Sequence, residues 1–227
     1  MLYGIIFELF ALVLCALAIS QGGWAWLALW PSASCLLVGV AYYINRPAVF
    51  GKRIDGTVRT ANSIVLLPFL LYLRGIWNLL RKFSREDQFN QLLDKVIIGR
   101  RPLAREVAEN VTVILDLTCE FSASLPQRQS LRYANFPILD AAAPANDDLP
   151  RLLILLESIP VNDLLYIHCA NGHGRTALVA SILLLIRGAA PDWQSAYQLA
   201  KQCRPECRLS SCQRKALKLA AEILRSR

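Results

Sequence analysis

The chain has 227 residues, of which 55% are hydrophobic and 19% charged, and it carries a net charge of +8. This apolar composition excludes an intrinsically disordered chain, and 11 Gly and 11 Pro exclude a collagen-like or low-complexity one. An apolar excess with a basic balance favours a membrane over nucleic acid, so we expect no nucleic-acid partner.

The apolar residues are concentrated at the start of the chain. Between Leu2 and Ile19 the only charged residue is Glu8, and the run from Trp24 to Ile44 has none. Each run is about 20 residues long, enough to cross a hydrocarbon core about 30 Å thick. The short polar connector Ser20–Gly23 suits a tight turn. We therefore predict a transmembrane helical hairpin over residues 1–45, with a pair of buried core helices as the alternative.

A third apolar stretch follows in the basic region 46–86. Its strongly apolar centre, Ile64–Leu73, is short for a membrane span, and Arg74 and Asn78 then interrupt it. An interfacial or re-entrant helix over residues 61–80 fits this pattern best, and a third membrane helix is the alternative.

Basic residues predict the orientation of the hairpin. The connector between the two runs has no Lys or Arg, whereas Arg46, Lys52, Arg53 and Arg59 follow the second run. The positive-inside rule places that side in the cytoplasm. The first run lacks the basic n-region of a signal peptide, which favours a retained anchor. We expect a membrane protein, in a bacterial-type inner membrane, with a cytoplasmic catalytic domain unless residues 61–80 also cross.

The remainder, residues 87–227, has the alternating pattern of a soluble α/β domain. Short apolar strands are predicted at 96–99, 111–117, 132–138 and 164–168. Helices are predicted at 102–110, 148–159, 176–187, 191–202 and 210–225, the last capped by Ser210 or Ser211. Strands that alternate with helices predict a mostly parallel central sheet flanked by helices.

The segment from His168 to Thr176 carries the candidate chemistry. It joins a strand to a helix, so backbone N–H groups and the positive helix end converge on one anion site. Cys169 lies at the base of this site, where those groups favour the thiolate, and Arg175 offers a planar fork for phosphate oxygens. The predicted phosphate-binding loop comprises Ala170, Asn171, Gly172, His173, Gly174 and Arg175. His168 would orient the loop, and Thr176 would hydrogen-bond the sulfur.

This segment resembles the Cys-x5-Arg signature of the protein tyrosine phosphatase superfamily, and the compact domain looks like its dual-specificity branch. The resemblance implies a nucleophilic Cys169, a phosphate-binding Arg175 and a phosphocysteine intermediate. It also implies a general-acid Asp about 30 residues before the cysteine. Asp140 fits, and Asp147 and Asp148 are alternatives that a helix N-terminus could instead use as caps.

The remaining charged and cysteine residues of this domain are not expected to take part in catalysis. Asp116 ends a buried strand and is expected to be structural, like Arg204 before Pro205. Arg100 and Arg101 are expected to form a solvated basic face, with contact to an anionic headgroup as the alternative. The cluster Cys203, Cys207 and Cys212 lacks a fourth zinc ligand, so no metal or other cofactor is expected. Cys119 could form a protective disulfide with Cys169.

The substrate is left open between two monoester classes. One is a phosphotyrosine or dual-specificity phosphoprotein, which we favour slightly. The other is a phospholipid monoester such as phosphatidylglycerophosphate. The resemblance disfavours a polyphosphorylated inositol, because lipid-directed relatives often carry Lys or Arg in the loop, where this chain has Ala170, Asn171 and His173 at the variable positions. An anchored phosphate-binding module without turnover and a sulfurtransferase are the alternatives from other classes.

Overall fold

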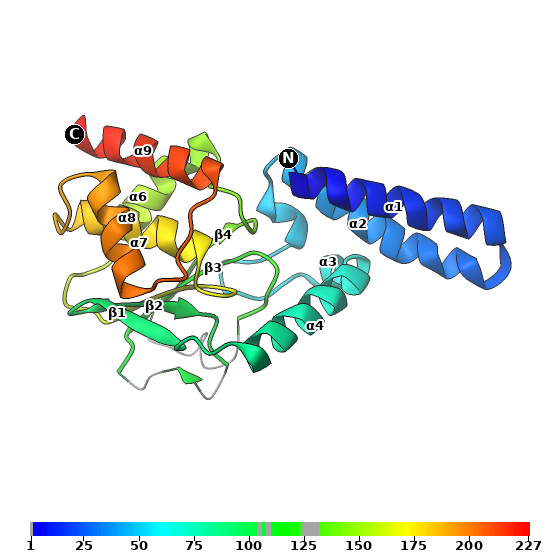
Figure 1. Cartoon of the computed structure of the whole chain (residues 1–227), viewed down its shortest axis with the longest axis horizontal. Helices are drawn as coiled ribbons and strands as arrows, with labels where there is room; N and C mark the ends of the chain where they lie inside the picture. The colour runs from blue at the N-terminus through cyan, green and yellow to red at the C-terminus, as the bar shows by residue number, and fades with distance from the viewer. Residues whose placement is uncertain (1, 104–105, 108–109, 124–131) are drawn as a thin grey trace. The chain divides into compact units, whose positions relative to one another are not determined.

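The computed structural model describes residues 2–103, 106–107, 110–123 and 132–227 (Figure 1). The described chain forms two compact units. The first comprises Met1–Arg53, Thr57–Ser84 and Cys119–Ser122, and the second Ile54–Gly56, Arg85–Thr118 and Ala123–Arg227.

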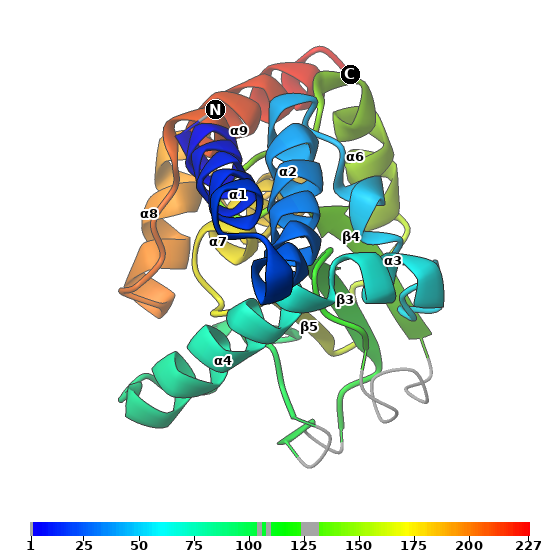
Figure 2. The same ribbon diagram turned by 90° about the vertical axis from the view of Figure 1, so that its right-hand side faces the viewer.

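Two apolar helices, α1 (Leu2–Gln21) and α2 (Leu29–Tyr43), lie side by side in the first unit, as both Figure 1 and Figure 2 show. A 3₁₀ turn, Gly23–Ala28, leads into α2. The two helical segments are long and apolar enough to cross a membrane by length and composition. The hydroxyl of Ser32 donates to the carbonyl of Ala11 at 2.7 Å, so a polar side chain is satisfied between the helices.

The third apolar stretch forms two helices, α3 (Thr60–Val65) and α4 (Leu67–Phe83), which are separated at Leu66. Neither reaches the length and hydropathy of the two segments above. The indole of Trp30 donates to the carbonyl of Ile64 at 3.2 Å, and the ring of Phe69 lies 5.3 Å from that of Phe7. The two helices therefore pack against the hairpin within the first unit, and their depth in a membrane stays a prediction.

The second unit contains a five-stranded sheet in the order β1-β2-β5-β3-β4. Strands β2, β5, β3 and β4 are parallel, and β1 pairs antiparallel with β2. Helices α6, α7, α8 and α9 lie on one face (Figure 2). The strands are β1 (Phe89–Leu93), β2 (Val96–Arg100), β3 (Val113–Thr118), β4 (Arg132–Ile138) and β5 (Leu165–Cys169). The helices are α6 (Leu149–Glu157), α7 (Gly174–Ile186), α8 (Trp193–Cys203) and α9 (Ser211–Arg225).

Alternation along the strands separates two cores. Val96, Ile98 and Leu165 face the helices, where α7 is buried almost entirely. Ile114 and Tyr166 face a smaller cluster on the opposite side. The predicted mostly parallel sheet flanked by helices is confirmed, and so are its four strands. The antiparallel β1 was not predicted, and the helix expected over 102–110 lies partly outside the described residues.

Candidate active site

Cys169 is the last residue of the central strand β5 and is only 3% exposed. In the strand register it lies opposite Arg100 of β2, and the amide of Arg101 donates to the carbonyl of Ala170 at 3.1 Å. The sheet therefore delivers the thiol to its carboxyl edge, where α7 begins five residues later at Gly174. A helix N-terminus at this edge favours anions, as the sequence pattern predicted.

Gly172 fixes how the loop leaves the sheet. Its φ is +75°, a left-handed conformation that glycine adopts without strain. A Cβ atom there would lie 2.3 Å from the carbonyl carbon of Gly99 and 2.6 Å from the amide nitrogen of Arg100. The loop thus packs backbone-to-backbone against β2, and only glycine fits at this position.

Arg175 and Asp140 form an ion pair beside the loop. Arg175 is the second residue of α7 and is 1% exposed, and one of its Nη atoms donates to the carbonyl of Ile138 at 3.0 Å. Its other Nη atom lies 3.1 Å from Oδ1 of Asp140, whose side chain is 66% exposed. The structure thus brings together the predicted phosphate-binding arginine and the predicted general acid.

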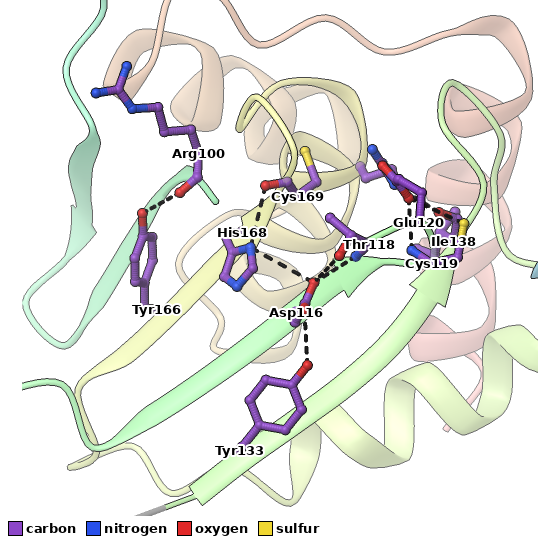
Figure 3. Close-up of polar contacts among 11 residues, drawn as sticks. Arg100, Asp116, Thr118, Cys119, Glu120, Tyr133, Ile138, Tyr166, His168 and Cys169 are labelled. Carbon is purple, nitrogen blue, oxygen red and sulfur yellow. Dashed lines mark hydrogen bonds and ion pairs between the residues drawn. The ribbon is translucent and has the colours of Figure 1, made fainter. Parts of the chain in front are cut away.

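His168 lies behind the loop, on the face of the sheet opposite Cys169, because adjacent strand residues point to opposite faces. Its Nδ1 lies 3.9 Å from Oδ1 of Asp116 and donates weakly, at 3.4 Å, to the carbonyl of Cys169 (Figure 3). The hydroxyl of Thr176 is buried without a hydrogen-bond partner among the described residues. His168 is thus placed to orient the backbone at Cys169.

Asp116 anchors a buried polar cluster under His168. Its carboxylate accepts hydrogen bonds from the amide and hydroxyl of Thr118 at 2.8 and 2.7 Å and from the hydroxyl of Tyr133 at 2.9 Å (Figure 3). Burial and the neighbouring carboxylate raise the pKa of Tyr133. These contacts fit the structural role expected for Asp116, because its carboxylate is fully buried and hydrogen-bonded within the cluster.

A second polar cluster supports the loop from outside the sheet. Nε2 of His173 donates to Oε2 of Glu86 at 2.7 Å, and the buried guanidinium of Arg204 donates to the same oxygen at 2.9 Å. Arg204 also donates to the carbonyl of Asn171 at 3.3 Å and to the side chain of Asn90 at 2.7 Å. His173 is therefore tied directly, and Asn171 through Arg204, to the segment that precedes β1.

Cys207 is a buried thiol next to the loop. Its Sγ donates to the carbonyl of Gly172 at 3.9 Å, and burial raises its pKa to about 12. All seven cysteines belong to the described residues and are free thiols. The described residues contain no group of three or more His, Cys, Asp or Glu that could hold a metal ion.

The remaining candidates lie away from the loop or play smaller parts. Asp148 pairs with Arg151 at 3.2 Å, one turn into α6, and its side chain caps no backbone amide of the described helix.

Three residues that contact the site were not predicted from the sequence: Glu86, Gln213 and Ile138, the last through its carbonyl. Of these only Gln213 carries a local signal, because Ser210-x-x-Gln213 matches a helix capping box.

A family model of the DSP-PTPase phosphatase domain, described as a Swiss Army Knife protein (PTP-SAK), matches residues 102–221, more than half of the chain. The chain belongs to this family. The match covers every predicted catalytic and loop residue of the DSP-PTPase domain, and the first 101 residues lie outside it.

Two viral proteins resemble this DSP-PTPase chain in sequence. A candidate tyrosine phosphatase of Invertebrate iridescent virus 3 (067L) is 32% identical over 102 residues, which are 40% of this chain and 42% of the viral protein. One of Invertebrate iridescent virus 6 (197R) is 35% identical over 60 residues, 24% and 23% of the two chains. The chain therefore spans less than half the length of these relatives.

Solved structures support the DSP-PTPase fold. Human DUSP28 superposes with a TM-score of 0.53 at 18% identity, covering 62% of this chain and 97% of DUSP28. Tk-PTP in its active form gives 0.53 at 24% identity, covering 60% and 97%. PTPMT1, solved in complex with PI(5)P, gives 0.52 at 15% identity, covering 62% and 98%.

Proposed function

We propose that this chain is a membrane-anchored phosphatase that hydrolyses phosphate monoesters through a phosphocysteine intermediate. The observation that carries the proposal is the 3.1 Å contact between Asp140 and Arg175, at the end of the loop that starts with Cys169. The loop between β5 and α7 would then supply both the nucleophile, Cys169, and the anion site, and Asp140 beside Arg175 would supply the acid. Membership of a cysteine phosphatase family supports the same chemistry.

In the first step Sγ of Cys169 attacks phosphorus, the bond to the leaving oxygen breaks, and Asp140 donates a proton to that oxygen. In the second step Asp140 takes a proton from water, the resulting hydroxide attacks the phosphocysteine, and the S–P bond breaks to release phosphate and thiolate. Arg175 and the loop amides balance the charge on the phosphoryl oxygens. Thr176 would donate to the departing thiolate.

Hydrolysis of aryl phosphates by the full-length protein in detergent tests this proposal. Cys169→Ser should abolish turnover, and Asp140→Asn should lower it by about 10²–10⁴-fold for phenyl phosphate, the usual contribution of a general acid. Cys203→Ser, which changes a thiol outside the loop, is the matched control. Wild-type turnover no faster than that of Cys169→Ser would refute the enzyme and favour an anchored phosphate-binding module.

The side of the membrane is part of the proposal. We place the catalytic domain in the cytoplasm of a bacterial-type cell, because the basic residues that follow α2 favour that side and because a catalytic thiolate needs a reducing compartment. Alkaline phosphatase fused after Arg227 should stay inactive in a bacterial host, since that reporter folds only outside the cytoplasm. An active fusion would instead mean that residues 61–80 cross the membrane.

A phospholipid monoester is the second candidate substrate, beside a phosphotyrosine or dual-specificity phosphoprotein. It is favoured by a groove of about 550 Å³ within the first unit, lined almost entirely by apolar side chains of α1, α2 and α4, among them Phe10, Pro31 and Phe69. PTPMT1, a structural neighbour, was solved in complex with PI(5)P. Detergent-solubilised protein offered phosphatidylglycerophosphate and a phosphotyrosine peptide side by side separates the two substrates by their kcat/KM.

A further inference from the structure

Gln213 is the third residue of α9 and is 1% exposed. Together with Ser210 it forms a capping box: the amide of Gln213 donates to Oγ of Ser210 at 3.3 Å, and the amide of Ser210 donates to Oε1 of Gln213 at 3.0 Å. This motif stabilises the start of the helix. It uses only the acceptor half of the Gln213 side chain.

The donor half of the same amide reaches the turn that carries Asp140. Nε2 of Gln213 donates to the carbonyl of Ala142 at 2.9 Å. The turn is closed by the amide of Ala142, which donates to the carbonyl of Leu139 at 3.1 Å, so that Asp140 and Ala141 are its central residues. Gln213 therefore holds this turn from outside.

The turn needs such support because of its backbone. Ala141 has φ +55°, a left-handed conformation that costs a non-glycine residue free energy and persists only where its surroundings impose it. Sγ of Cys212 donates to the carbonyl of Ala141 at 3.3 Å, a second contact from the first turn of α9. The side chain of Asp140 is mostly exposed, so packing does little to fix it.

The same glutamine also touches the phosphate-binding loop. A Cβ atom placed on Gly174 would lie 2.8 Å from Oε1 of Gln213, so this side chain packs directly on the first residue of α7. One buried amide thus contacts both the end of the loop that starts at Cys169 and the turn that carries Asp140.

We propose that Gln213 is a positioning residue for the general acid: it sets the Asp140 turn relative to the phosphate-binding loop. This inference rests on the proposed phosphatase function and on the role of Asp140 in it. Gln213 contacts no reacting atom. In kcat/KM, which reports formation of the phosphocysteine and not its hydrolysis, its effect should appear only where the leaving group needs a proton.

Gln213→Glu is the sharpest variant. A carboxylate keeps the acceptor for the Ser210 amide, and Ser-x-x-Glu is itself a capping box, so α9 should remain capped. An acidic residue in the first turn also suits the helix dipole. The substitution turns the hydrogen bond to the carbonyl of Ala142 into repulsion between two oxygens. It also adds a carboxylate beside Gly174, an effect that both esters share, so the ratio of the two kcat/KM values reports the lost donor. Gln198→Glu, the same change on the exposed face of α8, is the matched control.

The readout compares two aryl phosphates. Phenyl phosphate has a strongly basic leaving group that needs the acid, and 2,4-dinitrophenyl phosphate has one that departs unaided. For Gln213→Glu we expect kcat/KM to fall about tenfold with the first ester, as the loss of one hydrogen bond allows, and less than about twofold with the second. Ser210→Ala removes the cap but keeps the amide of residue 210, so it should lower the melting temperature without this selectivity.

The outcomes separate the inference from the proposed function. If Asp140→Asn shows the selective loss and Gln213→Glu shows none, or loses both esters equally, the positioning role of Gln213 is overturned alone. If Asp140→Asn lowers kcat/KM for both esters equally or for neither, the assignment of the acid falls and the inference falls with it. A selective loss in Gln213→Glu with a melting temperature close to that of Gln198→Glu supports the inference.

Discussion

Replacement of Gly172 by alanine tests whether the loop depends on backbone contact with β2. The added Cβ would lie 2.3 Å from the carbonyl carbon of Gly99, more than 1 Å inside the roughly 3.5 Å at which carbon atoms touch. The positive φ adds about 1–2 kcal/mol of strain, and the overlap about 1–3 kcal/mol more. We expect a total cost of about 2–5 kcal/mol and, because the loop must shift by about 1 Å, a loss of about 10²-fold in turnover.

Gly188→Ala provides the matched control. Gly188 also has a positive φ, +65°, but nothing lies within 4 Å of its Cβ position. It should therefore cost only the strain, about 1–2 kcal/mol, and leave turnover unchanged. Thermal unfolding and phenyl phosphate hydrolysis measure both variants in the full-length protein. Turnover of Gly172→Ala equal to that of Gly188→Ala would refute the reasoning, because it would mean that the loop tolerates the shift.

Three further changes have defined outcomes. Tyr133→Phe should cost about 1–3 kcal/mol in thermal unfolding, since it deprives the buried carboxylate of Asp116 of a donor, and should leave kcat within about twofold because the cluster lies behind the sheet. Arg204→Met should lower the melting temperature by about 5 °C, from about 1.5–3 kcal/mol for the loss of its charge-assisted hydrogen bonds to Glu86 and Asn90, whereas exposed Arg208→Met should not. The free energy of unfolding, measured in urea, should fall as pH rises above about 9, because the thiol of Cys207 ionises there in the unfolded chain while its folded pKa is about 12. Cys207→Ala should reduce this dependence of the unfolding free energy on pH.

The sequence predicted most of the sheet because its central strands are short apolar runs. Val113–Thr118 and Leu165–Cys169 are buried on both faces, so their composition alone indicates strands. Strand β1 (Phe89–Leu93) was not predicted, because it contains the polar residues Asn90 and Gln91 and lies at the sheet edge, where pairing with β2 determines its conformation.

The chemistry-bearing loop was predictable because its residues are neighbours in the chain. Cys169 and Arg175 are six positions apart, and the strand before them and the helix after them fix their approach. The support of the loop was not predictable. Glu86 meets His173 across 87 positions and Arg204 meets Asn171 across 33, and no local pattern encodes those contacts.

The nucleophile and the acid depend on different kinds of support, and this difference can be measured. The loop after Cys169 is fixed by backbone packing of Gly172 on β2, so a disturbance there displaces the nucleophile for every substrate. The turn of Asp140 is fixed by side chains, namely the donor of Gln213 and the ion pair with Arg175. Variants of the first kind should lower kcat/KM for all aryl phosphates alike, whereas loss of the Gln213 donor should lower kcat/KM only where the leaving group needs a proton.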